Sequence, residues 1–348
     1  MHKSRREFLE LAGMTGGALL IPSVARLADS TPLAADLPPA LNPNLLERFV
    51  DPLPIAPVAR SSGMRPSPRD PAVNLPVYRL EMRAIDVKLH RDLPPTRQWS
   101  YGGSVPGPTI ETRSGEGLLV EWVNNLPTRH FLPIDHTIHG AEASKPEVRT
   151  VAHVHGACVP PESDGYPENW QVPGQSRTFH YPNSQQAATL WYHDHAMGIT
   201  RLNLFAGLLG TFIVTDAEEE ALNLPRGEFD MPLMLYDRTL DRSAQLLYPR
   251  SNKPAAPWVS EFYGNMTLCN GKFRPYLEVQ PRRYRFRIVN GANSRFFGLR
   301  LSNGKPFQQI GTDMGLLPGP LSAFPSPARP TVSRPRARMA STHLEPRQ

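Results

Sequence analysis

The sequence predicts an all-β protein built from β-sandwich or barrel units, and three observations lead to this prediction. The 348 residues include 39 prolines, which disfavour long helices because proline lacks a backbone N–H and fixes φ. Short segments with strand-like alternation recur, and turns rich in glycine and proline separate them. Hydrophobic residues make up 40% of the chain, which is enough for globular cores.

Strand signals follow a proline-rich arm, which we predict over residues 31–76. Apolar residues alternate over residues 77–89, and a change of phase at Ala84-Ile85 predicts a bulge or bend. These residues open a first domain, predicted over residues 77–217. Its further strands are expected at residues 109–111, 118–123, 151–155, 189–195 and 208–214.

A second, partial domain is predicted over residues 228–318. Within it, residues 283–288 alternate arginine with aromatic or aliphatic side chains, which gives one charged and one apolar face. From residue 319 the chain is rich in proline, serine and arginine. Such a composition buries too little apolar surface to offset its ordering entropy, so we predict a disordered tail over residues 319–348.

The first 30 residues predict an export signal. Residues 4–9 read Ser-Arg-Arg-Glu-Phe-Leu, which resembles a twin-arginine motif, and a modest apolar stretch follows over residues 11–24. That stretch is too short to span a bilayer, so no stable membrane insertion is expected. We expect export by the twin-arginine machinery to the periplasm or the cell exterior, and an ordinary basic N-terminus is the alternative.

Charge and cysteine content exclude two classes of protein. The net charge is +6, but residues 319–348 hold five arginines and one acidic residue, which leaves the rest of the chain nearly balanced. Nucleic-acid binding is therefore not indicated. Cys158 and Cys269 are the only cysteines, so there is neither a disulfide framework nor a cysteine-rich zinc site.

Two short histidine pairs, His153 with His155 and His193 with His195, point to a metal site. Residues two apart on a strand face the same side. Two such strands side by side would bring four imidazoles together, a donor set that suits copper, zinc, iron or nickel. Asp194 would point to the opposite face and orient the nearby backbone. A lone histidine is usually structural, but two pairs at strand ends favour metal ligation.

Residues 45–318 resemble the multicopper oxidases, most closely the branch of the bacterial spore-coat laccases and bilirubin oxidases. The motifs that carry this resemblance include the histidine pairs and occur in the family's order. They are residues 90–97, 106–111, 130–139, 153–156, 163–168, 190–197, 270–272 and 275–281.

The resemblance implies cupredoxin-like Greek-key β-sandwich domains, three in the family and here one complete and one partial. It implies that a small-molecule reductant is oxidised at a type 1 copper and that a trinuclear copper cluster reduces O2 to water. It assigns His153 to the type 2 copper, His155 and His193 to one type 3 copper, and His195 to the other. Asp164 matches the family's acidic residue that delivers protons to the reduced oxygen, although a turn role is the alternative.

The resemblance also implies ligands that this sequence does not contain. The family's remaining cluster ligands and its type 1 site come from a His-Pro-x-His-x-His and a His-Cys-His motif, whereas after His195 the only histidine is His343. We expect the chain to hold half of the cluster ligands and to be inactive alone, and a frameshift near residue 319 is one expected cause. Two alternatives are an exported non-catalytic cupredoxin module that binds copper or a protein partner, and a hydrolytic zinc enzyme.

Overall fold

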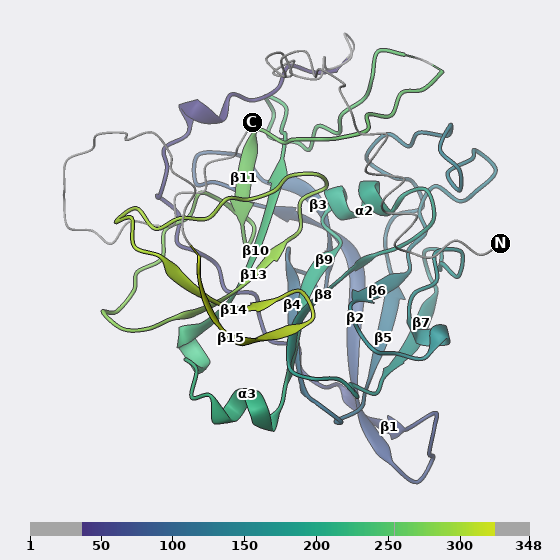
Figure 1. Ribbon diagram of the computed structural model, residues 1–348. Helices are drawn as coiled ribbons and strands as arrows, with labels where there is room; N and C mark the ends of the chain where they lie inside the picture. The colour runs from purple at the N-terminus through teal and green to yellow at the C-terminus, as the bar shows by residue number, and fades with distance from the viewer. Residues whose placement is uncertain (1–36, 254, 324–348) are drawn as a thin grey trace, which may run out of the picture. The chain divides into compact units, whose positions relative to one another are not determined.

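Strands account for most of the regular structure in the computed structural model, which describes residues 37–253 and 255–323 (Figure 1). The predicted all-β class is confirmed. The export signal predicted over residues 1–30 lies outside the described residues, as does most of the predicted tail. No helix in the described ranges is long and apolar enough to cross a membrane.

The first sheet is organised around a long strand, β2 (Asn74–Val87). Strand β2 runs parallel to β5 and antiparallel to β3, and its register with β3 is continuous from Met82 to Val87. The bulge predicted at Ala84-Ile85 is therefore wrong. The change of apolar phase instead accompanies a change of partner, because β2 leaves β5 at Met82 and continues along β3. The remaining strands are β1 (Gly63–Pro66), β3 (Thr96–Tyr101), β5 (Leu118–Asn124) and β7 (Ser176–Tyr181).

The second sheet has the order β4-β9-β8-β6 and carries both histidine pairs. Its strands are β4 (Gly107–Arg113), β6 (Ala152–His155), β8 (Ala188–Asp194) and β9 (Leu209–Thr215), and helix α2 (Thr200–Ala206) lies between β8 and β9. Aromatic side chains join the two sheets: the rings of Tyr101 and Trp122 lie 5.2 and 5.3 Å from that of Tyr192 on β8. This buried cluster makes the pair of sheets a β-sandwich.

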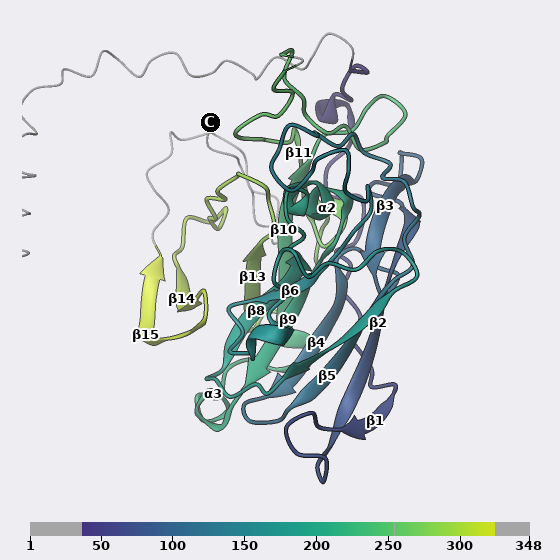
Figure 2. The ribbon, with the colours of Figure 1, turned by 90° about the vertical axis from the view of Figure 1, so that its right-hand side faces the viewer.

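A third sheet follows, with the order β12-β11-β10-β13. Short helices, α3 (Ala217–Ala221) and the 3-10 turn η3 (Gly227–Phe229), lead into it from β9. Its strands are β10 (Asp230–Arg238), β11 (Met266–Cys269), β12 (Lys272–Phe273) and β13 (Arg285–Asn290). A hairpin of β14 (Phe307–Thr312) and β15 (Gly315–Ala323) completes the described chain (Figure 2). Strand β15 crosses residue 319, where the predicted tail begins.

Strand β13 buries its charged face rather than its apolar face. Arg285 and Arg287 are buried, whereas Phe286 and Ile288 are 40% and 43% exposed. Burying a guanidinium is costly unless it is paired. The structure therefore needs acidic partners at this position.

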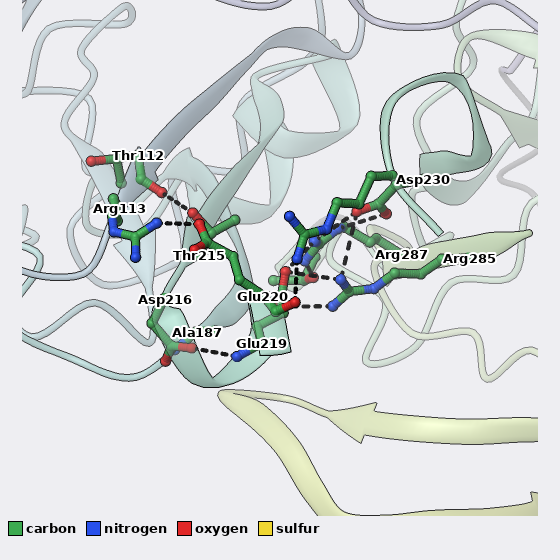
Figure 3. A network of polar contacts seen from close by, with 12 residues as sticks. Thr112, Arg113, Ala187, Thr215, Asp216, Glu219, Glu220, Asp230, Arg285 and Arg287 are labelled. Carbon is green, nitrogen blue, oxygen red and sulfur yellow. Dashed lines mark hydrogen bonds and ion pairs between the residues drawn. The ribbon is translucent and has the colours of Figure 1, made fainter. Parts of the chain in front are cut away.

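Glu219 on α3 and Asp230 on β10 are these partners (Figure 3). Arg285 donates to both carboxylate oxygens of Glu219 at 2.9 Å, and Arg287 donates to Asp230 at 2.8 and 2.9 Å. Arg287 also donates to Thr189 Oγ1 on β8 at 3.0 Å. The network thus connects the third sheet to the strand that carries His193. Burial alone would raise the pKa of Glu219, but the two arginines outweigh it and lower the pKa.

We predict that Glu219→Gln lowers the free energy of unfolding by about 3 kcal/mol, because it leaves buried guanidinium charge without compensation. The folded-state pKa of Glu219 lies below its ordinary value of 4.5. Its stabilisation is therefore present above about pH 4.5 and is lost as the pH falls through the folded pKa. Urea unfolding at a series of pH values measures both effects.

The matched control is Asp86→Asn, which removes a carboxylate from an exposed pair with Arg97. Exposed pairs contribute about 0–1 kcal/mol. Equal losses in the two variants would contradict a stabilising role for the buried network.

Candidate metal centre

The antiparallel pairing of β6 with β8 brings the predicted metal ligands together. His153 lies directly opposite His193, and His155 lies opposite Trp191. Opposite residues in an antiparallel pair share a face, and so do residues two apart. His195 follows the end of β8, and its N–H donates to the Val151 carbonyl at 2.8 Å, which extends the pairing.

The four imidazole rings form one cluster. One ring nitrogen from each of His153, His155 and His193 lies within 4.8 Å of the others. The ring of His195 joins them at 4.8 Å from His153 and 5.7 Å from His193, measured between centroids. The spacing leaves room for ions to be bound between the rings.

Main-chain carbonyls determine which ring nitrogens are free to bind a metal. His153 Nδ1 lies 2.6 Å from the Asp164 carbonyl oxygen, and His193 Nδ1 lies 2.7 Å from the Asp194 carbonyl oxygen. A carbonyl only accepts hydrogen bonds, so both Nδ1 atoms carry hydrogen and both Nε2 atoms keep a lone pair. This arrangement is typical of metal-ligating histidines.

Burial keeps the His193 ring uncharged at neutral pH. Together with the neighbouring imidazoles, it lowers the pKa of His193 to about 3. Burial and the nearby His153 also lower the pKa of His195. Nδ1 of His195 is buried and has no hydrogen-bond partner among the described residues. A bound cation would satisfy this orphaned nitrogen, so the residues fit a metal that prefers neutral imidazole, such as copper or zinc.

Asp194 lies on the opposite face of β8, as its spacing predicts, and is fully buried. Its carboxylate accepts the N–H groups of Val151 and Ala196 at 3.0 and 3.1 Å, and the Asn203 side-chain amide at 2.9 Å. Burial raises its pKa to about 7, although these hydrogen bonds act against the rise. Asp194 therefore holds the backbone just before the first histidine pair, at Val151, and just after the second, at Ala196.

Asp164 contacts the cluster mainly through its backbone. Its carboxylate is about half exposed and lies 3.3 Å from His153 Nδ1, whereas its carbonyl lies nearer. The adjacent Gly165 has a φ of +82°, and a Cβ there would lie 2.2 Å from the Ala152 carbonyl oxygen. Only glycine lets this turn pack so closely against β6.

The other histidines lie outside the cluster in the part of the chain that the structure describes. The ring of His130 packs at a tilt against that of Trp99 and contacts Asn203 Oδ1, and His90 is buried against the Glu47 carbonyl. Cys158 and Cys269 are both free. Burial raises the pKa of the Cys269 thiol to about 12, which makes it inert.

Two neighbours of the cluster were not predicted from the sequence. The ring of Trp191 lies 4.4 Å from that of His193, centroid to centroid. Asp313, far along the chain, has Oδ2 at 3.6 Å from Nε2 of His155. Trp191 lies two residues before His193 on β8, so its spacing places it beside the pairs. No local sequence pattern indicates that Asp313 lies near them.

Comparisons with known proteins identify the family that this chain resembles. The family model described as multicopper oxidase matches residues 145–219, which contain all four histidines. A laccase from Bacillus subtilis is 47% identical over 289 residues, which cover 78% of this chain and 55% of the relative. A laccase from Haloferax volcanii is 40% identical, with 86% of this chain and 50% of that protein covered.

The chain belongs to the multicopper oxidase family.

Solved structures of this family share the fold, and the predicted cupredoxin-like class is confirmed by them. A laccase from Pediococcus acidilactici has a TM-score of 0.65 at 27% identity, covering 80% of this chain and 54% of that one. A multicopper oxidase from Campylobacter jejuni has a TM-score of 0.64 at 26% identity, covering 83% and 53%. The chain thus spans about half the length of the relatives it matches. Family membership implies copper as the metal.

We predict that Asp194→Ala lowers the free energy of unfolding by about 3 kcal/mol. The substitution leaves two buried backbone N–H groups and the Asn203 amide without their acceptor, and each unsatisfied group costs about 1–3 kcal/mol. Urea unfolding measures the loss.

Asp70→Ala serves as the control for this variant, because Asp70 also accepts a backbone N–H, from Ala72, but at an exposed position. Its loss should stay below about 1 kcal/mol, since water replaces the acceptor. An Asp194→Ala protein as stable as this control would show that the buried carboxylate does not hold the strands.

Proposed function

We propose that this chain is the copper-binding N-terminal part of a laccase-type multicopper oxidase, which oxidises a small-molecule reductant and reduces O2 to water. The single observation that supports this proposal is the cluster of four imidazoles carried by β6, by β8 and by the residue that follows β8. It lies inside the segment that the family model matches.

Each histidine has a proposed place in a trinuclear cluster. His153 would hold the type 2 copper, His155 and His193 one type 3 copper, and His195 the other. Copper, when bound, supplies the one-electron steps that pass electrons from the reductant to dioxygen. The chain contributes fixed nitrogen donors, because the Asp164 and Asp194 carbonyls hold the His153 and His193 rings with Nε2 free.

Asp164 is the proposed proton donor. Its carboxylate is open to solvent and lies 3.3 Å from the His153 ring, so it can take a proton from water and carry it toward the cluster. The position of this carboxylate beside the proposed type 2 ligand supports the role.

We further propose that these 348 residues alone bind copper without completing the oxidase reaction. The printed sequence has neither of the family's two motifs for the remaining ligands and the type 1 site, and His343 is its only histidine after His195. Electrons from a reductant would have no entry site in such a chain.

Copper binding is the first test. We predict that the wild-type chain takes up copper and that His193→Ala lowers its affinity more than about tenfold, because a buried ligand is lost. Competition against a chelator measures the affinity. His139→Ala is the control, since that ring is 86% exposed and lies outside the cluster. A wild-type chain that binds no copper would contradict the proposal, and so would tightly held zinc with hydrolytic activity.

The same preparation tests the oxidase assignment by oxygen uptake with a phenolic reductant. The chain alone should consume no oxygen. Co-expression with a laccase segment that carries both family motifs should restore uptake, and His155→Ala should abolish it. Copper binding without restored uptake would favour the non-catalytic copper module instead.

Export by the twin-arginine route is also proposed, on the pattern of residues 4–24. We predict that replacing Arg5 and Arg6 by lysine keeps the protein in the cytoplasm, because the receptor reads paired arginine. Cell fractionation of a producing bacterium measures the distribution. Lys3→Arg is the control and should leave export unchanged, and export of the double variant at the wild-type level would refute the signal.

A further inference from the structure

A buried side-chain amide lies behind the histidine cluster and contacts the carboxylate of Asp194. This amide belongs to Asn203 on α2, which is fully buried. Its Nδ2 donates to the Arg149 carbonyl at 3.0 Å and to Asp194 Oδ2 at 2.9 Å. Because a carbonyl only accepts hydrogen bonds, Nδ2 must face Arg149, and Oδ1 must face a donor on the other side. His130 occupies that side, with Nε2 at 3.1 Å from Oδ1.

The protonation of His130 matches this requirement. The Leu132 N–H donates to His130 Nδ1 at 3.0 Å, so Nδ1 keeps its lone pair and Nε2 carries the hydrogen of the neutral ring. Burial lowers the pKa of His130 to about 4, so the ring is neutral at pH 7. The ring of Trp99 packs against it at 4.1 Å between centroids. His130 is therefore held as a hydrogen-bond donor to Asn203.

The next bonds in this series reach the proposed metal ligands. Asp194 Oδ2, which accepts from Asn203, also accepts the N–H of Ala196 at 3.1 Å, and Ala196 directly follows His195. The main-chain carbonyl of Asp194 lies 2.7 Å from His193 Nδ1. A shift of the Asn203 amide would therefore be transmitted to the residue that lies between two of the histidines.

Loss of the His130 N–H would disturb this series at its first bond. Oδ1 of Asn203 would lose its hydrogen bond inside the protein, which is unfavourable for a buried acceptor. Rotating the amide to expose Oδ1 elsewhere would place that oxygen against the Asp194 carboxylate and the Arg149 carbonyl, which offer no hydrogen. Either response displaces the Asp194 side chain.

We propose that His130 is a positioning residue of the metal centre, which acts through Asn203 and Asp194 to hold His193 and His195 in place. The inference rests on the proposed copper-binding function and adds to it a residue that is not itself a ligand. The N–H at Nε2, rather than the ring, carries the role, so a side chain that restores this donor should restore the site.

Titration of the full chain with Cu²⁺ tests the proposal. His130→Phe keeps a ring against Trp99 but removes both nitrogens. We expect it to weaken Cu²⁺ binding about three- to tenfold, less than the roughly 10–100-fold typical of a direct partner of a metal ligand. The electron paramagnetic resonance spectrum of the one-equivalent complex should change its hyperfine pattern. His130→Gln supplies an N–H close to the position of Nε2 and should restore both the affinity and the spectrum.

His90→Phe is the matched control. His90 is fully buried and has the same bonding pattern: the Asp92 N–H donates to its Nδ1 at 3.2 Å, and its Nε2 lies 2.8 Å from the Glu47 carbonyl. This variant loses an equivalent pair of hydrogen bonds outside the cluster, so it should change thermal unfolding but neither the copper affinity nor the spectrum. Titrations are run below the lowest unfolding temperature of the set.

The Asn203→Leu background identifies the route by which His130 acts. If His130 acts through the amide, His130→Phe should cause little further loss of copper affinity in that background, and a full additional loss would overturn the proposal. Wild-type affinity and spectrum in His130→Phe, or an equal change in His90→Phe, would also overturn it while leaving the proposed function intact. A wild-type chain that binds no Cu²⁺ would instead overturn the proposed function.

Discussion

The antiparallel register between β6 and β8 is the constraint on which the candidate metal centre depends. A slip of one residue would turn the histidines of one strand toward the core, because alternate residues face opposite sides. Val154 and Tyr192 are paired and fully buried on the inner face, so a slip would also expose them to water. The Asp194 carboxylate also stabilises this register, because it accepts a hydrogen bond from the Val151 N–H at the start of β6.

Main-chain groups, rather than side chains, orient the His153 and His193 rings. Gly165 lets the following turn approach β6, and this approach brings the Asp164 carbonyl to 2.6 Å from His153 Nδ1. Carbonyl positions are fixed by the fold, so the free Nε2 atoms are positioned before any metal arrives. Such preorganisation lowers the entropy that binding would otherwise cost.

Buried charge holds the other end of β8. Arg287 on β13 donates to Thr189 Oγ1, and the Ala187 N–H donates to the Asp216 carboxylate. Both contacts lie at the beginning of β8. Asp216 also caps α3 through the Glu219 N–H, so the helix that carries Glu219 is fixed to the same strand. The third sheet and the histidine strand therefore share one ion network.

The sequence by itself determined the all-β class and the composition of the cluster, because both follow from periodicity two along single strands. It also determined that Asp194 faces away from the histidines. Only the tertiary structure decided that Arg285 and Arg287 are buried, since their burial requires acidic partners from other elements. It likewise decided that β2 changes partner and that Asp313 meets His155. Contacts between residues far apart in the chain leave no local pattern, so sequence periodicity cannot indicate them.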